Sequence, residues 1–163
     1  GINLELARLD FVHLHESDFS SANLSGITAD EASFCVSVFR GAKLTRAHLV
    51  RADLSRCDLS DADLRKANLT YCKLRGAVLT GAKADRIILQ GADLRGAKLM
   101  GASLDRADLR GADLRDADLT GATLYRARLN GADLEGAVIE PDALDAVRYD
   151  ETQEQPRNPE KSS

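Results

Sequence analysis

Residues 91–124 read GADLRGAKLMGASLDRADLRGADLRDADLTGATL, in which a leucine returns every fifth residue with an alanine two positions before it. The same phase continues in both directions without insertion or deletion, from Leu4 to Ile139. The 28 sites of this series hold 22 Leu, three Phe, one Ile and two Ala, and the sites two residues earlier hold 20 Ala. The repeat fills most of the 163 residues and therefore decides the fold.

Neither an α-helix nor a flat strand can bury this pattern on one side. Five steps of about 100° would wind the leucines around a helix, and a side-chain period of two would send successive leucines to opposite faces of a strand. A chain that turns by a quarter after each short segment points every leucine, and the small residue before it, inward. Four segments then close a square coil of 20 residues, and the coils stack about 4.8 Å apart through strand-type hydrogen bonds. The sequence predicts an all-β solenoid of about seven such coils, roughly 33 Å long.

Two details support the 20-residue coil. Ala29 replaces leucine in the segment where Ile27 replaces alanine, which exchanges a large and a small side chain within one layer. Phe19 and Phe39 lie 20 residues apart, and a serine precedes each by two positions, so we expect the rings to stack. The small second residue follows from packing, because a narrow square cannot hold two large side chains per wall.

The repeated unit A(D/N)Lxx, seen as ANLSG, ADLSR, ADLRK, ANLTY, ADLRG and ADLTG, resembles the pentapeptide-repeat proteins over about residues 2–139. The resemblance implies a right-handed quadrilateral β-helix, and it suggests a bacterial, particularly cyanobacterial, source. Some bacterial relatives in this family protect DNA gyrase and confer quinolone resistance, a role attributed to an anionic rod that resembles DNA. Residues 1–139 of this chain carry 19 Lys and Arg against 19 Asp and Glu, so this rod is neutral and departs from that pattern.

The two ends of the repeat differ. After the solenoid of residues 1–139, we expect a short capping helix within residues 140–150, begun by Pro141, and a disordered tail over residues 151–163. At the other end, Leu6 and Phe11 fall at outward turn positions and no cap precedes the first coil. That coil is covered by a second copy of the chain or by another element, or else it is ragged and partly exposed.

One corner of the rod is a candidate binding site. The same turn position of five successive coils is occupied by Arg46, Lys66, Arg86, Arg106 and Arg126. At other corners the equivalent position is often glycine, for example at Gly81, Gly101 and Gly121 and at Gly91, Gly111 and Gly131. The five cations either form a solvated edge, paired with Asp85, Asp105 and Asp108 on the flanking walls, or a linear basic edge for an acidic protein surface or a phosphate backbone. Sparse aromatic residues and the absence of net positive charge argue against nucleic acid.

Other charged and metal-ligating residues carry weaker predictions. On a second wall, basic and acidic side chains should form an ion-paired ladder of Arg75, Arg95, Arg115, Asp93, Asp113 and Asp133. His13 and His15 face outward, and Cys35 lies one coil above His15. Three such ligands on adjacent strands could hold zinc, but no fourth ligand is in evidence. We therefore expect exposed histidines and no metal. Cys57 and Cys72 occupy inward sites and are expected to be buried free thiols.

The sequence points to a non-enzymatic protein without a cofactor. No glycine-rich phosphate loop lies between a strand and a helix, and the serines and aspartates lie on convex walls that offer no cleft. No apolar run reaches 18 residues, which argues against a membrane span. The sequence does not determine the location, but we favour the cytoplasm, since inward free cysteines are compatible with a reducing compartment. Two functions remain. The first is a rigid scaffold that presents a patterned surface to an unknown, acidic protein partner, and the second is a DNA-mimicking regulator of a topoisomerase.

Overall fold

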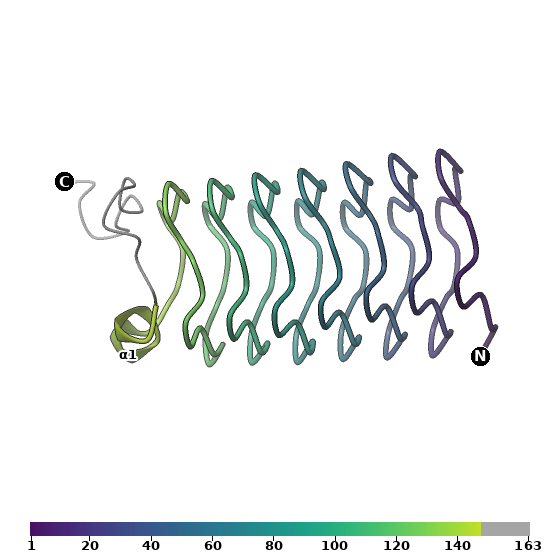
Figure 1. Cartoon of the computed structure of the whole chain (residues 1–163). Helices are drawn as coiled ribbons and strands as arrows, with labels where there is room; N and C mark the ends of the chain where they lie inside the picture. The colour runs from purple at the N-terminus through teal and green to yellow at the C-terminus, as the bar shows by residue number, and fades with distance from the viewer. Residues whose placement is uncertain (148–163) are drawn as a thin grey trace.

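The computed structural model describes residues 1–147, which form one straight stack of coils with the N-terminus at one end and a short helix at the other (Figure 1). The end of the expected capping segment, residues 148–150, and the whole of the expected tail, residues 151–163, lie outside the described residues.

Every coil pairs with the next through parallel bridges between residues 20 positions apart. The 24 bridges run from Asn3↔Asn23 to Asp118↔Val138 without a change of register. Each bridge joins the single residue that lies between a small inward residue and the following leucine, so a wall of the rod is only one bridging residue wide. The predicted quadrilateral parallel β-helix with a coil of 20 residues is confirmed.

The corners are tight turns with a left-handed third residue. In the first turn the Ala7 N–H donates to the Leu4 carbonyl at 2.9 Å, and Leu6 between them has a φ of 60°. A positive φ at that position is typical of a type II turn, which favours glycine. The conformation recurs at all positions of this series from 6 to 136, at 11 glycines and 16 other residues. The turn is therefore imposed by the coil and not by the residue type.

The Asp or Asn of the repeat has a definite structural task. Ladder and turn bonds use the N–H groups of the other four positions and leave the N–H of the residue after each leucine. The side chain one residue before the leucine accepts this N–H, as Asp93 does from Arg95 at 3.2 Å. All twelve Asp and Asn residues at that position do so: Asn3, Asp18, Asn23, Asp53, Asp58, Asp63, Asn68, Asp93, Asp108, Asp113, Asp118 and Asp133. Asp and Asn recur in the repeat because a short acceptor satisfies this donor.

The core is a stack of leucine and alanine layers with an aromatic cluster near its beginning. Phe19 and Phe39 stack at 5.0 Å between ring centroids with an interplanar angle of 15°, as predicted. Phe34 packs edge-on against both rings, at 5.9 and 5.5 Å. Ala29 and Ile27 are both buried, which fits the predicted exchange of volume.

The two inward thiols, Cys57 and Cys72, are fully buried free cysteines, as predicted. Each sulfur donates to a main-chain carbonyl, Cys57 to Phe34 at 2.9 Å and Cys72 to Ala52 at 3.1 Å. Burial raises the pKa of Cys57 to about 12 and raises that of Cys72 as well. Both thiols are therefore protonated core fillers at neutral pH.

One turn closes through a side chain instead of directly. The buried Ser37 hydroxyl donates to the Leu14 carbonyl at 2.8 Å and accepts the Ser17 N–H at 3.0 Å. The hydroxyl thus replaces the direct turn bond that other corners make, for example Ala22 N–H to Phe19 carbonyl. A polar atom inside the rod is tolerated here because both of its hydrogen-bonding roles are filled.

The last coil is followed by α1, Pro141–Asp145, which begins with proline in its first turn. Ala143, Leu144 and Val147 pack on the core in partly buried positions. The Ala146 carbonyl accepts the Arg126 N–H at 2.8 Å, and the Glu140 carboxylate accepts the Gly121 N–H at 3.0 Å. This segment therefore provides the hydrogen-bond acceptors that a further coil would otherwise provide for the N–H groups of the last coil.

The first coil has no comparable cover within residues 1–147. Ile2, Leu6 and Phe11 expose 57%, 73% and 67% of their surface, and the inward Leu4 and Leu9 are only half buried. The outward orientation predicted for Leu6 and Phe11 is confirmed. Among residues 1–147, no helix has the length and apolar character that crossing a bilayer requires.

Candidate partner-binding edge

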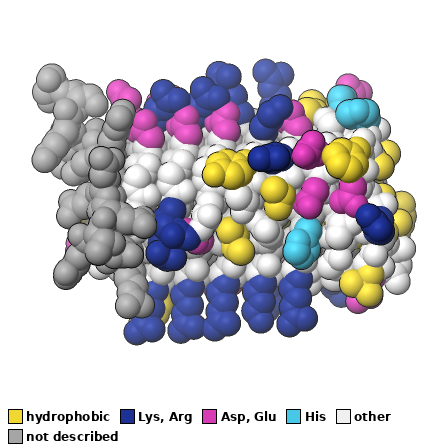
Figure 2. All heavy atoms as spheres, turned by 45° about the horizontal axis from the view of Figure 1, so that its top comes forward, with side chains coloured by type: hydrophobic (Ala, Val, Ile, Leu, Met, Phe, Trp, Pro, Cys, Tyr) yellow, Lys and Arg dark blue, Asp and Glu magenta, His cyan; other side chains and the backbone are white. Residues whose placement is uncertain are grey.

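The five cations singled out in the sequence lie along one corner of the rod. We call Arg46, Lys66, Arg86, Arg106 and Arg126 the basic edge. The residues are exposed and belong to successive coils about 4.8 Å apart. Figure 2 shows the edge as a straight row of Lys and Arg side chains along the lower margin of the molecule. The coil geometry thus converts a 20-residue spacing in the sequence into a linear array of positive charge.

The backbone under the basic edge is left-handed throughout. Its φ values lie between 57° and 62°, a region where a β-carbon costs about 1–2 kcal/mol. From residue 76 to residue 136 the chain makes 13 such turns, and nine of them use glycine. Three of the four exceptions are Arg86, Arg106 and Arg126. In this half of the rod, a non-glycine residue therefore adopts the strained backbone conformation mainly where that residue is an arginine of the basic edge.

The basic edge is free of ion pairs with residues 1–147. None of its five side chains lies within 4.0 Å of a described carboxylate. Arg126 instead lies 5.1 Å from the centre of the Tyr125 ring, within range of a cation–π contact.

The carboxylates expected to pair with the edge have other partners. Asp85 accepts the Ser103 hydroxyl at 2.8 Å, Asp105 accepts the Tyr125 N–H at 3.0 Å, and Asp108 pairs with Arg110 at 2.6 Å. Of the two alternatives for the edge, the one that pairs it with these three carboxylates is therefore not found within the described part of the chain. The physical reason is that each carboxylate is bound to the wall on which it lies.

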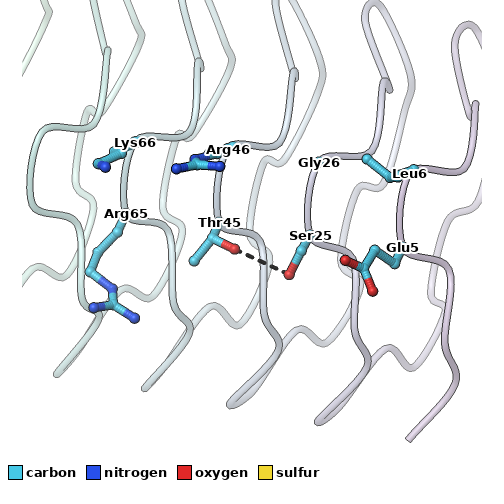
Figure 3. Close-up of a pocket in the computed structure, with 8 residues that line it drawn as sticks. All are labelled: Glu5, Leu6, Ser25, Gly26, Thr45, Arg46, Arg65 and Lys66. Carbon is cyan, nitrogen blue, oxygen red and sulfur yellow. Dashed lines mark hydrogen bonds between the residues drawn. The ribbon is translucent and has the colours of Figure 1, made fainter.

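Two shallow grooves follow the basic edge. One, of about 440 Å³, is drawn in Figure 3 and is lined by Glu5, Leu6, Ser25, Gly26, Thr45, Arg46, Arg65 and Lys66. The second, of about 570 Å³, continues from it and is lined by Arg65, Lys66, Asp85, Arg86, Asp105, Arg106 and Tyr125. Both are open to solvent and share Arg65 and Lys66. Such a surface suits a long partner better than an enclosed small molecule.

Side chains beside the edge add detail that the sequence reasoning missed. Arg65 and Tyr125 line the grooves from the position just before the edge residue. Arg65 is held by a two-point bond to Asp63, at 2.8 and 2.6 Å, and in Figure 3 it points away from Arg46 and Lys66. Sorting that neighbouring position by coil would have placed both residues beside the edge, although not the pairing of Arg65.

A second wall carries the predicted ladder of alternating charge. Arg95 makes a two-point bond to Asp93 and also lies 3.4 Å from Asp113 in the next coil. Arg115 repeats the arrangement with Asp113 and lies 3.8 Å from Asp133. The hydrogen bond from Arg95 is the main cause that lowers the pKa of Asp93.

This ladder is confirmed for Arg95 and Arg115 but not for Arg75, which forms no ion pair with residues 1–147. Such half-exposed pairs add modest stability.

The histidine cluster forms hydrogen bonds and not a ligand set. His15 Nε2 lies 2.7 Å from the Ser33 hydroxyl, and the ring of His13 meets that of His15 edge-on at 6.1 Å. Ser33 in turn lies 3.6 Å from the Cys35 sulfur, and burial raises the pKa of that thiol. Within residues 1–147, no three His, Cys, Asp or Glu side chains are grouped so as to hold a metal ion.

Comparison with known proteins agrees with this geometry. The family model for pentapeptide repeats matches in 8 copies, over residues 1–26, 17–56, 37–70, 57–96, 72–111 and 102–140. No curated protein matches the chain by sequence.

Solved structures of similar fold include a trypsin-treated variant of QnrB1, a plasmid-mediated fluoroquinolone resistance protein, at 20% identity and a TM-score of 0.80, covering 93% of this chain and 87% of that one. HetL from the cyanobacterium Nostoc, involved in regulating heterocyst differentiation, is 31% identical over 83% of this chain and 78% of its own, at a TM-score of 0.42. The chain belongs to the pentapeptide repeat family and folds as its right-handed quadrilateral β-helix.

Proposed function

We propose that this protein is a non-enzymatic rod that binds an acidic surface of a protein partner through the basic edge. The observation that carries the proposal is the row itself, five exposed cations in line without an ion pair to residues 1–147. Cations at such spacing repel one another unless an anion lies between or above them. An acidic partner would relieve this repulsion along the whole row.

The backbone supports the same proposal. A glycine at Arg86, Arg106 or Arg126 would relieve the left-handed strain, as glycine does at nine of the other ten turns from residue 76 to residue 136. In this half of the rod, where glycine is the rule at such turns, strain that persists at a surface position favours a functional role for the side chain. The openness of the two grooves supports binding over catalysis, because neither encloses a substrate away from water.

A matched pair of variants tests the proposal. The first reverses the five edge cations to Glu. The control reverses five exposed cations scattered over other positions, which likewise form no ion pair with residues 1–147: Lys43, Arg56, Arg75, Lys83 and Lys98. Both variants change the net charge by the same amount, and both have side chains where the native protein has side chains.

Binding of fluorescent poly-glutamate, followed by anisotropy at moderate salt, is the measurement. We expect the edge variant to lose at least about tenfold in affinity and the control less than about threefold. Equal losses would mean that only total charge matters, and the edge would then have no special role.

A second candidate is a topoisomerase regulator of the quinolone-resistance type. The fold similarity to QnrB1 favours it, at 20% identity. The balance of 19 cations and 19 anions over residues 1–139 opposes DNA mimicry by this rod. A gyrase supercoiling assay with and without a fluoroquinolone separates the two functions, because the acidic-partner proposal predicts no effect in either arm.

We further propose roles for the two ends. The half-exposed first coil would pair with that of a second copy, since one symmetric contact covers both open ends. Sedimentation of the protein and of a Leu6→Lys, Phe11→Lys variant tests this, and a monomer at all concentrations would contradict it.

Residues 140–150 would act as the C-terminal cap, supported by the packing of Leu144 and Val147. The buried thiols fit a reducing compartment, and we propose the cytoplasm.

A further inference from the structure

We infer that the element recognised by the basic edge is an α-helix with a stripe of acidic residues, lying parallel to the axis of the rod. The inference rests on the proposed function and names the kind of partner surface that fits it. It is carried by the spacing of the five cations, by the direction of their side chains and by the pairing of the aspartates Asp93 and Asp113 with arginines of the rod.

The spacing of the edge is set by the coils. Bridges between residues 20 positions apart place successive edge residues about 4.8 Å apart, so the row from Arg46 to Arg126 spans about 19 Å. Acidic residues that alternate three and four positions apart on a helix advance about 5.2 Å per step and cover about 21 Å in four steps. The two rows differ by only about 2 Å over their whole length.

An extended peptide matches the row poorly. Its side chains return to one face every second residue, about 6.7 Å apart, so five carboxylates span about 27 Å. The mismatch accumulates to about 8 Å, which leaves at least one cation without a partner. A row of acids crossing five neighbouring strands would match in pitch, but it needs a free carboxylate on every strand, whereas one helical segment of about 15 residues supplies all five.

The edge side chains can absorb the remaining difference. At these corners a side chain leans along the rod over the turn of the next coil, and Leu6 Cδ2 comes within 2.8 Å of the place where a β-carbon on Gly26 would lie. Figure 3 shows Arg46 and Lys66 extending in the same axial direction. The charged ends therefore move along the axis when a long side chain changes rotamer, which is the direction in which the two rows differ.

The rod does not offer a matching acidic row of its own. Its regular column of aspartates includes Asp93 and Asp113, and each of these carboxylates is bound by an arginine of the same wall. Side-by-side association of two copies would have to break these bonds. The structure thus favours a different protein as the partner along this edge.

Three synthetic peptides of equal charge test the inference. The first is a hydrocarbon-stapled 15-residue helix with Glu at positions 1, 4, 8, 11 and 15. The second is the same stapled helix with five Glu distributed around all faces. The third is an extended, proline-containing peptide with Glu at alternate positions. Each is titrated against the native protein and the five-residue edge reversal at 0.15 M salt, with circular dichroism confirming the peptide conformations.

We expect the striped helix to bind the native protein at least about tenfold more tightly than the other two, and to lose this advantage with the edge variant. Equal binding of all three peptides, with a loss for every peptide on edge reversal, would overturn the helix inference and leave the proposed function standing. Preference for the extended peptide would overturn it as well. Binding that ignores the edge reversal would overturn both proposals.

Discussion

The ring of Tyr71 lies directly over Gly91 in the next coil, in the space that a β-carbon on Gly91 would occupy. The two residues belong to the same corner of the rod, and both have a positive φ. The contact shows that the Tyr71 side chain extends along the axis of the rod and leaves no room for a β-carbon at residue 91.

A Gly91→Ala substitution should therefore destabilise the rod more than Gly111→Ala at the same corner. Both variants place a β-carbon in the left-handed region, at a cost of about 1–2 kcal/mol. Only the first also displaces the Tyr71 ring, since no atom lies within 4 Å of a β-carbon on Gly111. Urea denaturation followed by circular dichroism gives the comparison. Equal midpoints for the two variants would show that the ring moves aside freely.

The Ser37 hydroxyl should contribute measurably to the free energy of unfolding of the rod. A Ser37→Ala variant loses the hydroxyl that joins the Leu14 carbonyl to the Ser17 N–H, and we expect a loss of about 1–3 kcal/mol. Ser37→Cys should lose less, because Cys57 donates to a carbonyl from the equivalent site one coil later. If the alanine variant is as stable as the native protein, the Leu14 turn has closed directly, as other corners do.

The aspartates of the repeat should make the rod sensitive to acid. Hydrogen bonds from the Arg side chain and from the backbone N–H lower the pKa of Asp93 and Asp113 below the usual value of about 3.9. A group with a lowered folded pKa stabilises the protein fully above its unfolded pKa and loses this contribution as the pH falls through the folded pKa. We expect the melting temperature to be flat near neutral pH and to fall below about pH 4.

The matched control for this pH effect is the double variant Asp93→Asn, Asp113→Asn. Asparagine keeps an acceptor for the backbone N–H, as Asn23 and Asn68 do in the native chain, but it does not titrate. The acid-induced decrease should therefore be smaller in the variant. An unchanged pH profile would place the sensitivity elsewhere.

The three thiols should differ sharply in reactivity. At pH 8 the buried Cys57, with its pKa raised to about 12, is protonated and shielded, and Cys72 is as well. Cys35, which is only half buried, should be alkylated first by iodoacetamide, with the other two reacting only in denaturant. Mass spectrometry of the alkylated peptides gives the order, and early labelling of Cys57 would show that the rod opens locally in its second and third coils.

The sequence was sufficient for the architecture because the five-residue period has few physical solutions. It also placed Phe19 against Phe39 and buried Cys57 and Cys72, since these follow from the register alone. The role of Asp and Asn was not foreseen, because it depends on which N–H the coil leaves without a backbone partner. The sequence spacing places Asp108 on a wall beside the basic edge, but it does not show that Asp108 pairs with Arg110 and leaves the edge unpaired. That pairing depends on the direction of the side chains.

The constant step of 20 residues between bridged positions has an evolutionary consequence. Duplication or loss of a whole coil would lengthen or shorten the rod and leave every downstream column on its original face. Insertion of a single five-residue unit would also preserve the core, yet it would rotate all later columns by a quarter turn and break the basic edge in two. The fold thus tolerates the gain or loss of any number of five-residue repeats. Only changes in multiples of four repeats keep the basic edge on one corner of the rod.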